Sequence, residues 1–231
     1  MEPAGKAHAF VVDVEHPELE DHDRHHLERV LRLRAGDLLT IADGAGRWRE
    51  VRFGVELEPT GVVEIAERPA PEITIGFALV KGGRPELVVQ KLTEIGVDRV
   101  IPFVAERSVV QWEGDKAVRN HARLTTVARE AAMQSRRSWL PVVEPLTSFA
   151  EVAARPGATR ADRGGEPPTL ERPILLVGPE GGWSDSEREV GGPTVGLGST
   201  VLRAETAAIV AAAVLCGFRS VLFVPVVRHG G

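Results

Sequence analysis

From Ile73 to the end of the chain, short apolar runs alternate with segments of helical spacing, and this alternation limits the folds that the chain can adopt. Strands separated by helices are typical of a parallel sheet that helices cover on both faces. The pattern predicts strands at 73–80, 97–104 and 139–143, and helices at 86–95, 115–136 and 149–154. Residues 155–172, which are rich in Gly, Pro and charge, are expected to form an irregular loop.

The first 70 residues have a different pattern, in which short strands surround one helix. We expect strands at 10–14, 38–42, 48–57 and 62–66, and a helix at 23–33. The segment Pro-Ala-Pro at 69–71 then has the composition of a linker. The sequence therefore predicts two domains, a small β-rich domain at 1–70 and an α/β domain at 73–231.

Two segments close together near the C-terminus, at 174–184 and 195–206, each consist of an apolar run that ends in a glycine loop, and each precedes a helix-like segment. In such loops, backbone amides and carbonyls line whatever binds. Ser184 and Glu187 fit a capping box, so a helix should begin there. The first loop lacks the lysine of a phosphate loop and carries Glu180, which disfavours a triphosphate and tolerates a cation or zwitterion. From these residues alone, a cofactor site and a plain turn both remain open.

The segment 207–218 is almost entirely apolar, so a helix there must be buried on several sides. Either a central core helix or a subunit interface would explain it. Arg203 and Glu205 stand at its beginning, where they form either a surface ion pair or a substrate-orienting pair. Cys216, the single cysteine, is expected to be a small buried apolar residue rather than a nucleophile.

The net charge of −5 argues mildly against nucleic acid as a partner. A local basic segment at 107–137 weakens that argument. The chain has no apolar run of the roughly 20 residues that a membrane helix needs and no signal peptide, so we expect a cytoplasmic protein with no membrane partner. No metal is expected, because the histidines gather in the acidic N-terminal part without the spacing of ligands.

Several motifs together resemble one family. They are GPEGG at 178–182, LGSTVLRAETA at 197–207, QKLTEIG at 90–96, ERS at 106–108 and QSRR at 134–137. Together, and in their order along the chain, they are similar to the bacterial 16S ribosomal RNA uridine-N3 methyltransferases of the SPOUT superfamily. The segment HLERVLRLR at 26–34 resembles that family's RNA-binding domain of the PUA type. The resemblance covers nearly the whole chain.

The resemblance implies an α/β fold in which a C-terminal trefoil-knot domain follows a small N-terminal PUA-like β-rich barrel. It replaces the ordinary doubly wound sheet that the pattern alone suggests. It also implies a homodimer that binds S-adenosylmethionine and methylates a uridine in the decoding region of the small ribosomal subunit. Glu180 would then lie near the positive sulfonium. The implied cofactor-binding residues are Leu176, Gly178, Glu180, Gly182, Leu197, Gly198 and Leu202.

For catalysis we expect Arg203 and Arg137, from opposite subunits, to hold the phosphate and to stabilise the developing negative charge on the base. Glu205 would accept a proton or orient Arg203. The expected RNA-binding residues are Arg29, Arg32, Arg34, Arg107 and Arg136.

The chain departs from the family pattern at several positions. Arg136 replaces a common glycine, Trp139 replaces a common basic residue, and Ser-Thr stands at 199–200 in place of proline and arginine. The segment 161–167 replaces an apolar strand end and would change one wall of the adenosyl pocket. Two other functions remain open, a non-catalytic ribosome-binding protein and a Rossmann-like nucleotide enzyme. Free rRNA and the assembled subunit also both remain possible substrates.

Overall fold

The computed structural model describes residues 5–79, 84–110, 112–190 and 192–223. The chain forms two compact units. The N-terminal unit comprises Met1–Arg68 together with Arg129–Leu140, and the C-terminal unit comprises Pro69–Ala128 together with Pro141–Gly231.

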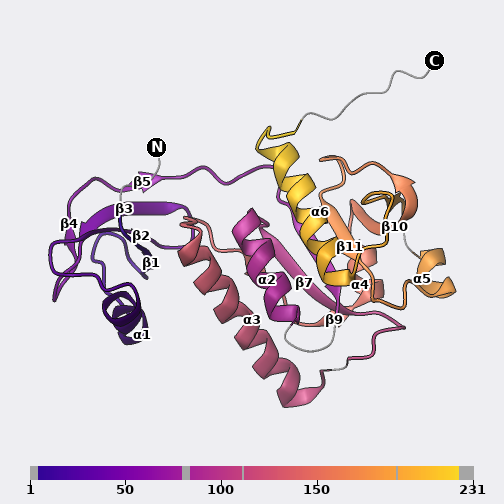
Figure 1. The fold of residues 1–231 in the computed structure, drawn as a ribbon, viewed down its shortest axis with the longest axis horizontal. Helices are drawn as coiled ribbons and strands as arrows, with labels where there is room; N and C mark the ends of the chain where they lie inside the picture. The colour runs from indigo at the N-terminus through magenta and orange to yellow at the C-terminus, as the bar shows by residue number, and fades with distance from the viewer. Residues whose placement is uncertain (1–4, 80–83, 111, 191, 224–231) are drawn as a thin grey trace. The chain divides into compact units, whose positions relative to one another are not determined.

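The C-terminal unit is built on a parallel sheet (Figure 1). The strands run in the order β12-β10-β11-β6-β7-β8, with β9 also paired to β7, and every pairing is parallel. The strands are β6 (Thr74–Ala78), β7 (Arg99–Val104), β8 (Val142–Val143), β9 (Thr147–Ser148), β10 (Ala158–Glu166), β11 (Ile174–Val177) and β12 (Thr194–Val195). The predicted parallel α/β sheet is confirmed.

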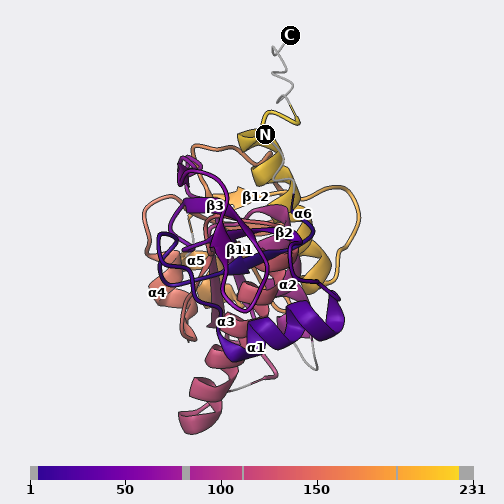
Figure 2. The ribbon, with the colours of Figure 1, turned by 90° about the vertical axis from the view of Figure 1, so that its left-hand side faces the viewer.

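Helices cover both faces of this sheet. They are α2 (Arg84–Ile95), α3 (Gly114–Gln134), α4 (Phe149–Ala153), α5 (Asp185–Val190) and α6 (Ala204–Arg219). Successive strand residues point to opposite faces. Leu175 and Val177 accordingly pack into the core with α2 and α6, while Leu176 packs into a second core with α4 and Trp183. Figure 2 shows α4 and α5 on one side of β11 and α2 and α6 on the other.

The expected irregular loop at 155–172 is wrong, because this segment contains β10, a nine-residue strand between β11 and β12. Its polar residues hid it from an apolar pattern. Thr159 and Arg160 are buried there, and both form hydrogen bonds: the Thr159 hydroxyl donates to the Ile174 carbonyl at 3.0 Å, and the two terminal nitrogens of Arg160 donate to carbonyls of α5. A polar strand is stable in a core when its side chains are bonded in this way.

The N-terminal unit contains a small sheet and a short helix. The strands are β1 (His8–Phe10), β2 (Leu38–Ala42), β3 (Arg47–Arg52), β4 (Glu58–Pro59) and β5 (Glu64–Ile65), in the order β1-β2-β3-β4 with β5 also on β3. The helix α1 (Asp21–His25) continues as one wider turn, η1 (His26–Val30). The predicted β-rich character is confirmed, although the strands predicted at 10–14, 48–57 and 62–66 are shorter or displaced, and the helix ends before 33.

The end of α3 belongs to the core of the N-terminal unit. Ala132 and Met133 pack among its buried residues, and Arg129 forms an ion pair with the buried Asp23, with nitrogen to oxygen distances of 2.9 and 2.5 Å. Two segments far apart in sequence therefore build this unit. Within the described residues, no helix is long and apolar enough to span a membrane.

Candidate functional site

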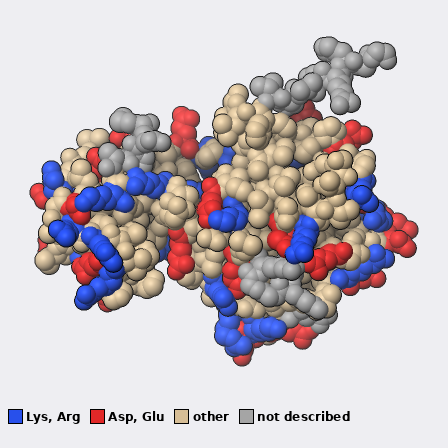
Figure 3. All heavy atoms as spheres, viewed as in Figure 1, with Lys and Arg blue, Asp and Glu red and all other residues tan. Residues whose placement is uncertain are grey.

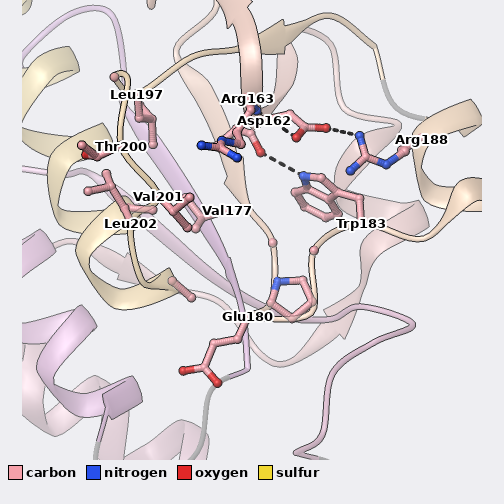
Figure 4. A pocket seen from close by; sticks show the side chains of 17 residues that line it. Asp162, Arg163, Val177, Glu180, Trp183, Arg188, Leu197, Thr200, Val201 and Leu202 are labelled. Atoms are coloured by element: carbon pink, nitrogen blue, oxygen red, sulfur yellow. Dashed lines mark hydrogen bonds and ion pairs between the residues drawn. The ribbon is translucent and has the colours of Figure 1, made fainter.

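A cavity of about 300 Å³ lies beyond the carboxyl end of β11 in the C-terminal unit, and we call it the loop pocket (Figure 4). Three segments form most of its lining: residues 161–163 of β10, the end of β11 with the first glycine loop at 178–183, and the second glycine loop at 197–202 with the start of α6. Arg188 of α5 completes the lining. In open α/β sheets, ligands bind at the carboxyl ends of the strands. The two glycine loops that the sequence singled out thus line one pocket.

The first glycine loop depends on two glycines. A Cβ atom on Gly178 would lie 2.9 Å from the indole ring of Trp183, and Gly182 has a φ of +69°. The capping box then starts α5, because the Ser184 amide donates to the Glu187 carboxylate at 2.9 Å and the Glu187 amide donates to the Ser184 hydroxyl at 3.2 Å. The other Glu187 oxygen accepts from the Glu106 amide at 2.8 Å. The predicted capping box is confirmed, and it also anchors the loop to the segment after β7.

Trp183 forms a buried wall of the loop pocket. Its ring stacks on Phe103 with centroids 6.2 Å apart and packs against Phe149 at 5.0 Å, while its indole nitrogen donates to the Ala161 carbonyl at 2.9 Å. These contacts fix the ring. Trp183 is not among the site residues predicted from the sequence, although an aromatic side chain directly after a glycine loop is a signal for such a role.

An adjoining wall comes from β10. Asp162 and Arg163 line the pocket, and Asp162 forms an ion pair with Arg188, which also lines it. Figure 4 shows these three side chains beside Trp183. The segment 161–167, which departs from the family pattern, therefore supplies a polar wall. Asp162, Arg163 and Arg188 are not among the predicted site residues. The first two lie in the segment 155–172, which the sequence pattern predicts to be an irregular loop.

Arg160 lies buried behind that wall and holds α5 in place. Its guanidinium donates to the carbonyls of Glu187 and Arg188 at 2.9 and 3.1 Å, and it lies over the Trp183 ring at 5.9 Å. Burial lowers the pKa of Arg160, and the charge of Asp162 opposes that shift. The free carbonyls at the end of a helix favour a cation at this position.

The second glycine loop approaches the backbone of β10. A Cβ atom on Gly196 would lie 2.8 Å from the Gly165 carbonyl oxygen, and Gly198 has a φ of +129°. Arg203 follows as the exposed residue that precedes α6, and the half-buried Glu205 lies in the first turn of that helix. Arg203 and Glu205 thus stand next to pocket-lining residues.

Most of the predicted cofactor-binding residues line the loop pocket, and one does not. Those that line the loop pocket are Gly178, Glu180, Gly182, Leu197, Gly198 and Leu202. Leu176 does not line it, because its side chain is buried in the apolar core of β11. The apolar lining also includes Val177, Val201 and Ala207.

The predicted RNA-binding residues lie in both units. Arg29, Arg32 and Arg34 are exposed on η1 and the segment after it. Arg107 donates to the Gly181 carbonyl at 3.1 Å, so it contacts the first glycine loop. On the face in Figure 3, blue Lys and Arg side chains lie beside red Asp and Glu over the N-terminal unit.

Arg136 and Arg137 follow the end of α3 in the N-terminal unit. Arg136 is exposed, and the Arg137 carbonyl accepts a hydrogen bond from the buried His8 at 3.0 Å. The proposed catalytic arginines Arg137 and Arg203 therefore belong to different units. Among the described residues, no three His, Cys, Asp or Glu side chains group as metal ligands.

Comparison with known proteins decides the family. The model of an RNA methyltransferase domain matches residues 66–216, and the model of an RNA methyltransferase PUA domain matches residues 19–54. The chain belongs to the RNA methyltransferase family. The resemblance that the motifs indicated is thereby confirmed.

Individual relatives agree with this family. The chain is 35% identical to the ribosomal RNA small subunit methyltransferase E of Synechocystis over 82% of this chain and 69% of that protein. It is 31% identical to the protein of the same name from Bacillus subtilis, over 81% and 84% of the two chains. A crystal structure of the Neisseria gonorrhoeae ribosomal RNA small subunit methyltransferase E bound to S-adenosyl methionine has a TM-score of 0.76 at 26% identity, covering 92% of this RNA methyltransferase and 97% of that chain.

Proposed function

We propose that this RNA methyltransferase transfers a methyl group from S-adenosylmethionine to N3 of a uridine in the 16S rRNA of the small ribosomal subunit. The observation that carries the proposal is the loop pocket, in which two glycine loops meet a fixed tryptophan wall. The similar Neisseria protein, by its printed title, binds S-adenosyl methionine.

The lining of the loop pocket suits S-adenosylmethionine. The missing side chain of Gly178 leaves backbone groups open beside the Trp183 ring. Backbone groups of Gly182, Leu197 and Leu202 would hold the adenosyl and methionyl parts, and the Glu180 carboxylate suits the positive sulfonium. When bound, S-adenosylmethionine supplies an activated methyl group.

The chain's own residues would prepare the uridine. N3 of uridine carries a proton and is paired in a duplex, so the base must be exposed, deprotonated and aligned. Arg203, beside the loop pocket, would stabilise the negative charge that develops on the base, and Glu205 would accept the proton or orient Arg203. In a homodimer, Arg137 of the partner subunit would hold a phosphate of the RNA.

The two parts of the chain would divide the work. The domain at 1–70 would bind RNA as a PUA-like domain, through the exposed Arg29, Arg32 and Arg34, with Arg107 and Arg136 as further contacts. The domain at 73–231 would carry the trefoil knot and the chemistry. Ribosomal RNA as the substrate would place the enzyme in the cytoplasm.

A homodimer would cover the apolar side chains of α6 that the C-terminal unit leaves partly open. Ile209, Val210 and Val214 are only half-buried, and Val201 before the helix is 74% exposed. Figure 3 shows a broad uncharged area over α6. Exposed apolar patches of this kind mark interaction surfaces.

The deciding experiment incubates the protein with labelled S-adenosylmethionine and small subunits from a strain that lacks the modification, and then maps the methylated nucleotide. We expect methyl on N3 of one uridine. A ribose methyl group or another methylated base would overturn the substrate assignment. Calorimetry separates the other functions: a ribosome-binding protein without activity would bind no S-adenosylmethionine, and a Rossmann-like enzyme would prefer a dinucleotide.

A further inference from the structure

A second cavity, of about 410 Å³, lies within the N-terminal unit, and we call it the histidine cavity. Three segments of that unit line it: the chain before and at the start of β1, the helical turns α1 and η1 with the residue after them, and the end of α3. Its lining residues are Lys6, Ala7, His8, His22, Asp23, His26, Leu31, Glu130, Met133, Gln134 and Arg136.

The floor of the histidine cavity is largely apolar. His8 is buried, with Nδ1 2.8 Å from the Thr40 hydroxyl and Nε2 3.0 Å from the Arg137 carbonyl. A carbonyl only accepts, so Nε2 carries the proton and Nδ1 accepts from Thr40. Burial lowers the pKa of His8 to about 4, and the ring is therefore neutral at pH 7. Together with Ala7 and Met133, which are also buried and line the cavity, this neutral ring provides weakly polar surface against which an aromatic base could pack.

The rim of the cavity carries groups that read and hold a nucleotide. Gln134 is exposed and offers both a donor and an acceptor, as the edge of a base requires. His22 and His26 add further polar ring atoms. Arg136 is an exposed cation at the rim, whereas Lys6 is ion-paired with Asp37 at 2.6 Å. Glu130 adds an exposed carboxylate to the lining. The buried Asp23 does not oppose an anion there, because Arg129 neutralises it.

Arg136 occupies a backbone position that favours glycine. Its amide donates to the Met133 carbonyl at 3.2 Å, and the Arg137 amide donates to the Ala132 carbonyl at 2.9 Å. This pair of bonds is the Schellman ending of a helix, in which the residue at the position of Arg136 adopts a left-handed conformation. Its φ is +55°. A side chain there costs about 1 kcal/mol relative to glycine, so an arginine at the mouth of a cavity indicates a use beyond folding.

We infer that the histidine cavity binds one nucleotide of single-stranded RNA, with the base on the His8 and Met133 floor and the phosphate on Arg136. The inference rests on the proposed function, because that function requires the enzyme to hold rRNA near the target uridine. A base in a duplex is stacked and paired and cannot enter a recessed cavity, whereas a base in a loop or single strand can.

The first test measures the binding of a labelled single-stranded oligouridylate to the full chain by fluorescence anisotropy. We expect Arg136→Gly to weaken binding about tenfold and to lower the salt dependence by about one phosphate contact. The same variant should keep or raise the thermal midpoint, because glycine suits the left-handed position. Loss of affinity would then not be a folding defect. Gln134→Ala should also weaken binding.

The matched control is Arg52→Ala, since Arg52 is an exposed arginine on β3 that does not line the cavity. It should bind like the unmodified chain. An oligomer that contains 4-thiouridine should crosslink, on irradiation, to His26, Met133 or Gln134. The inference is overturned if the unmodified chain does not bind the oligomer, if both cavity variants bind within twofold of it, if crosslinks map elsewhere, or if duplex RNA binds equally well.

Failure of this inference is distinguishable from failure of the proposed function. Calorimetry with S-adenosylmethionine reports on the loop pocket alone. Cavity variants that bind S-adenosylmethionine and RNA normally would overturn the inference and spare the proposed function. If the cavity variants lose RNA affinity but the unmodified chain does not bind S-adenosylmethionine, the inference is supported and the proposed function is overturned.

Discussion

Single atoms decide whether the loop pocket is open. At Gly178, an added Cβ atom would lie 2.9 Å from the Trp183 ring. Trp183 cannot move away, because Phe103, Phe149 and the Ala161 carbonyl hold its ring. One added methyl group must therefore displace the loop.

We predict that Gly178→Ala lowers the affinity for S-adenosylmethionine at least tenfold and destabilises the fold by about 1–3 kcal/mol through overpacking. Calorimetry and urea unfolding measure the two effects. Gly61→Ala is the control, since Gly61 has nothing within 4 Å of its Cβ position. Equal affinity in Gly178→Ala would show that the loop does not contact the cofactor.

Arg203 tests the proposed chemistry separately from binding. Arg203→Ala should abolish methyl transfer and leave the affinity for S-adenosylmethionine nearly unchanged, because the charge is needed only when the base becomes anionic. Single-turnover assays and calorimetry give the two numbers. Arg172→Ala, at an exposed position away from the loop pocket, should be fully active. Full activity of Arg203→Ala would remove Arg203 from the site.

His8 predicts a pH dependence of stability. Its pKa is about 4 in the folded chain against 6.5 ordinarily, so the unfolded chain takes up a proton first as the pH falls. The resulting contribution of His8 to the free energy of unfolding is fully present above pH 6.5 and is lost as the pH falls from 6.5 to 4. Its size is on the order of 3 kcal/mol, at about 1.4 kcal/mol per pKa unit. Urea unfolding at several pH values gives the free energy of unfolding as a function of pH. Between pH 4 and pH 6.5 this free energy should change less steeply with pH in His8→Gln than in the unmodified chain, and equally steeply in His22→Gln. Identical slopes in His8→Gln and the unmodified chain would contradict this account.

At the scale of elements, β10 shows how polar residues build a buried strand. Arg160 joins it to α5 through two backbone carbonyls, and the Asp162 to Arg188 ion pair joins the same two elements again. The position of α5, and with it the first glycine loop, therefore depends on a strand that carries no apolar signal.

Arg160→Met should destabilise the C-terminal unit by about 2 kcal/mol, because two carbonyls lose their donor inside the protein. It should also lower the affinity for S-adenosylmethionine, because Trp183 loses a neighbour. Arg163→Met on the same strand is the control for stability, since Arg163 is exposed. Urea unfolding and calorimetry measure both quantities. If Arg160→Met were as stable as Arg163→Met, Arg160 would not hold α5.

At the scale of the whole molecule, α6 combines a buried face with an open one. Ala208, Ala211 and Leu215 are fully buried against the sheet, while Val210 is half-buried. Our proposed homodimer would cover the open face and bring Arg137 of one subunit toward Arg203 of the other.

Val210→Arg should shift the protein from dimer to monomer and lower methyl transfer, because a charge would have to be buried at the interface. Sedimentation velocity gives the mass, and Val55→Arg, at a residue that is 94% exposed in the N-terminal unit, is the control. A monomeric unmodified chain with full activity would remove the homodimer from the proposal.

The sequence by itself determined the features that rest on local patterns. The apolar strands around Ile75 and Leu175, the capping box of Ser184 and Glu187, and the two glycine loops were all predictable, because periodicity and turn chemistry act over a few residues. The motifs then identified the family. Only the tertiary structure decided the rest. It placed β10 in the sheet, Trp183 and Asp162 in the loop pocket, and Met133 in the N-terminal core, because partners distant in the chain satisfy these residues and no local pattern records those contacts.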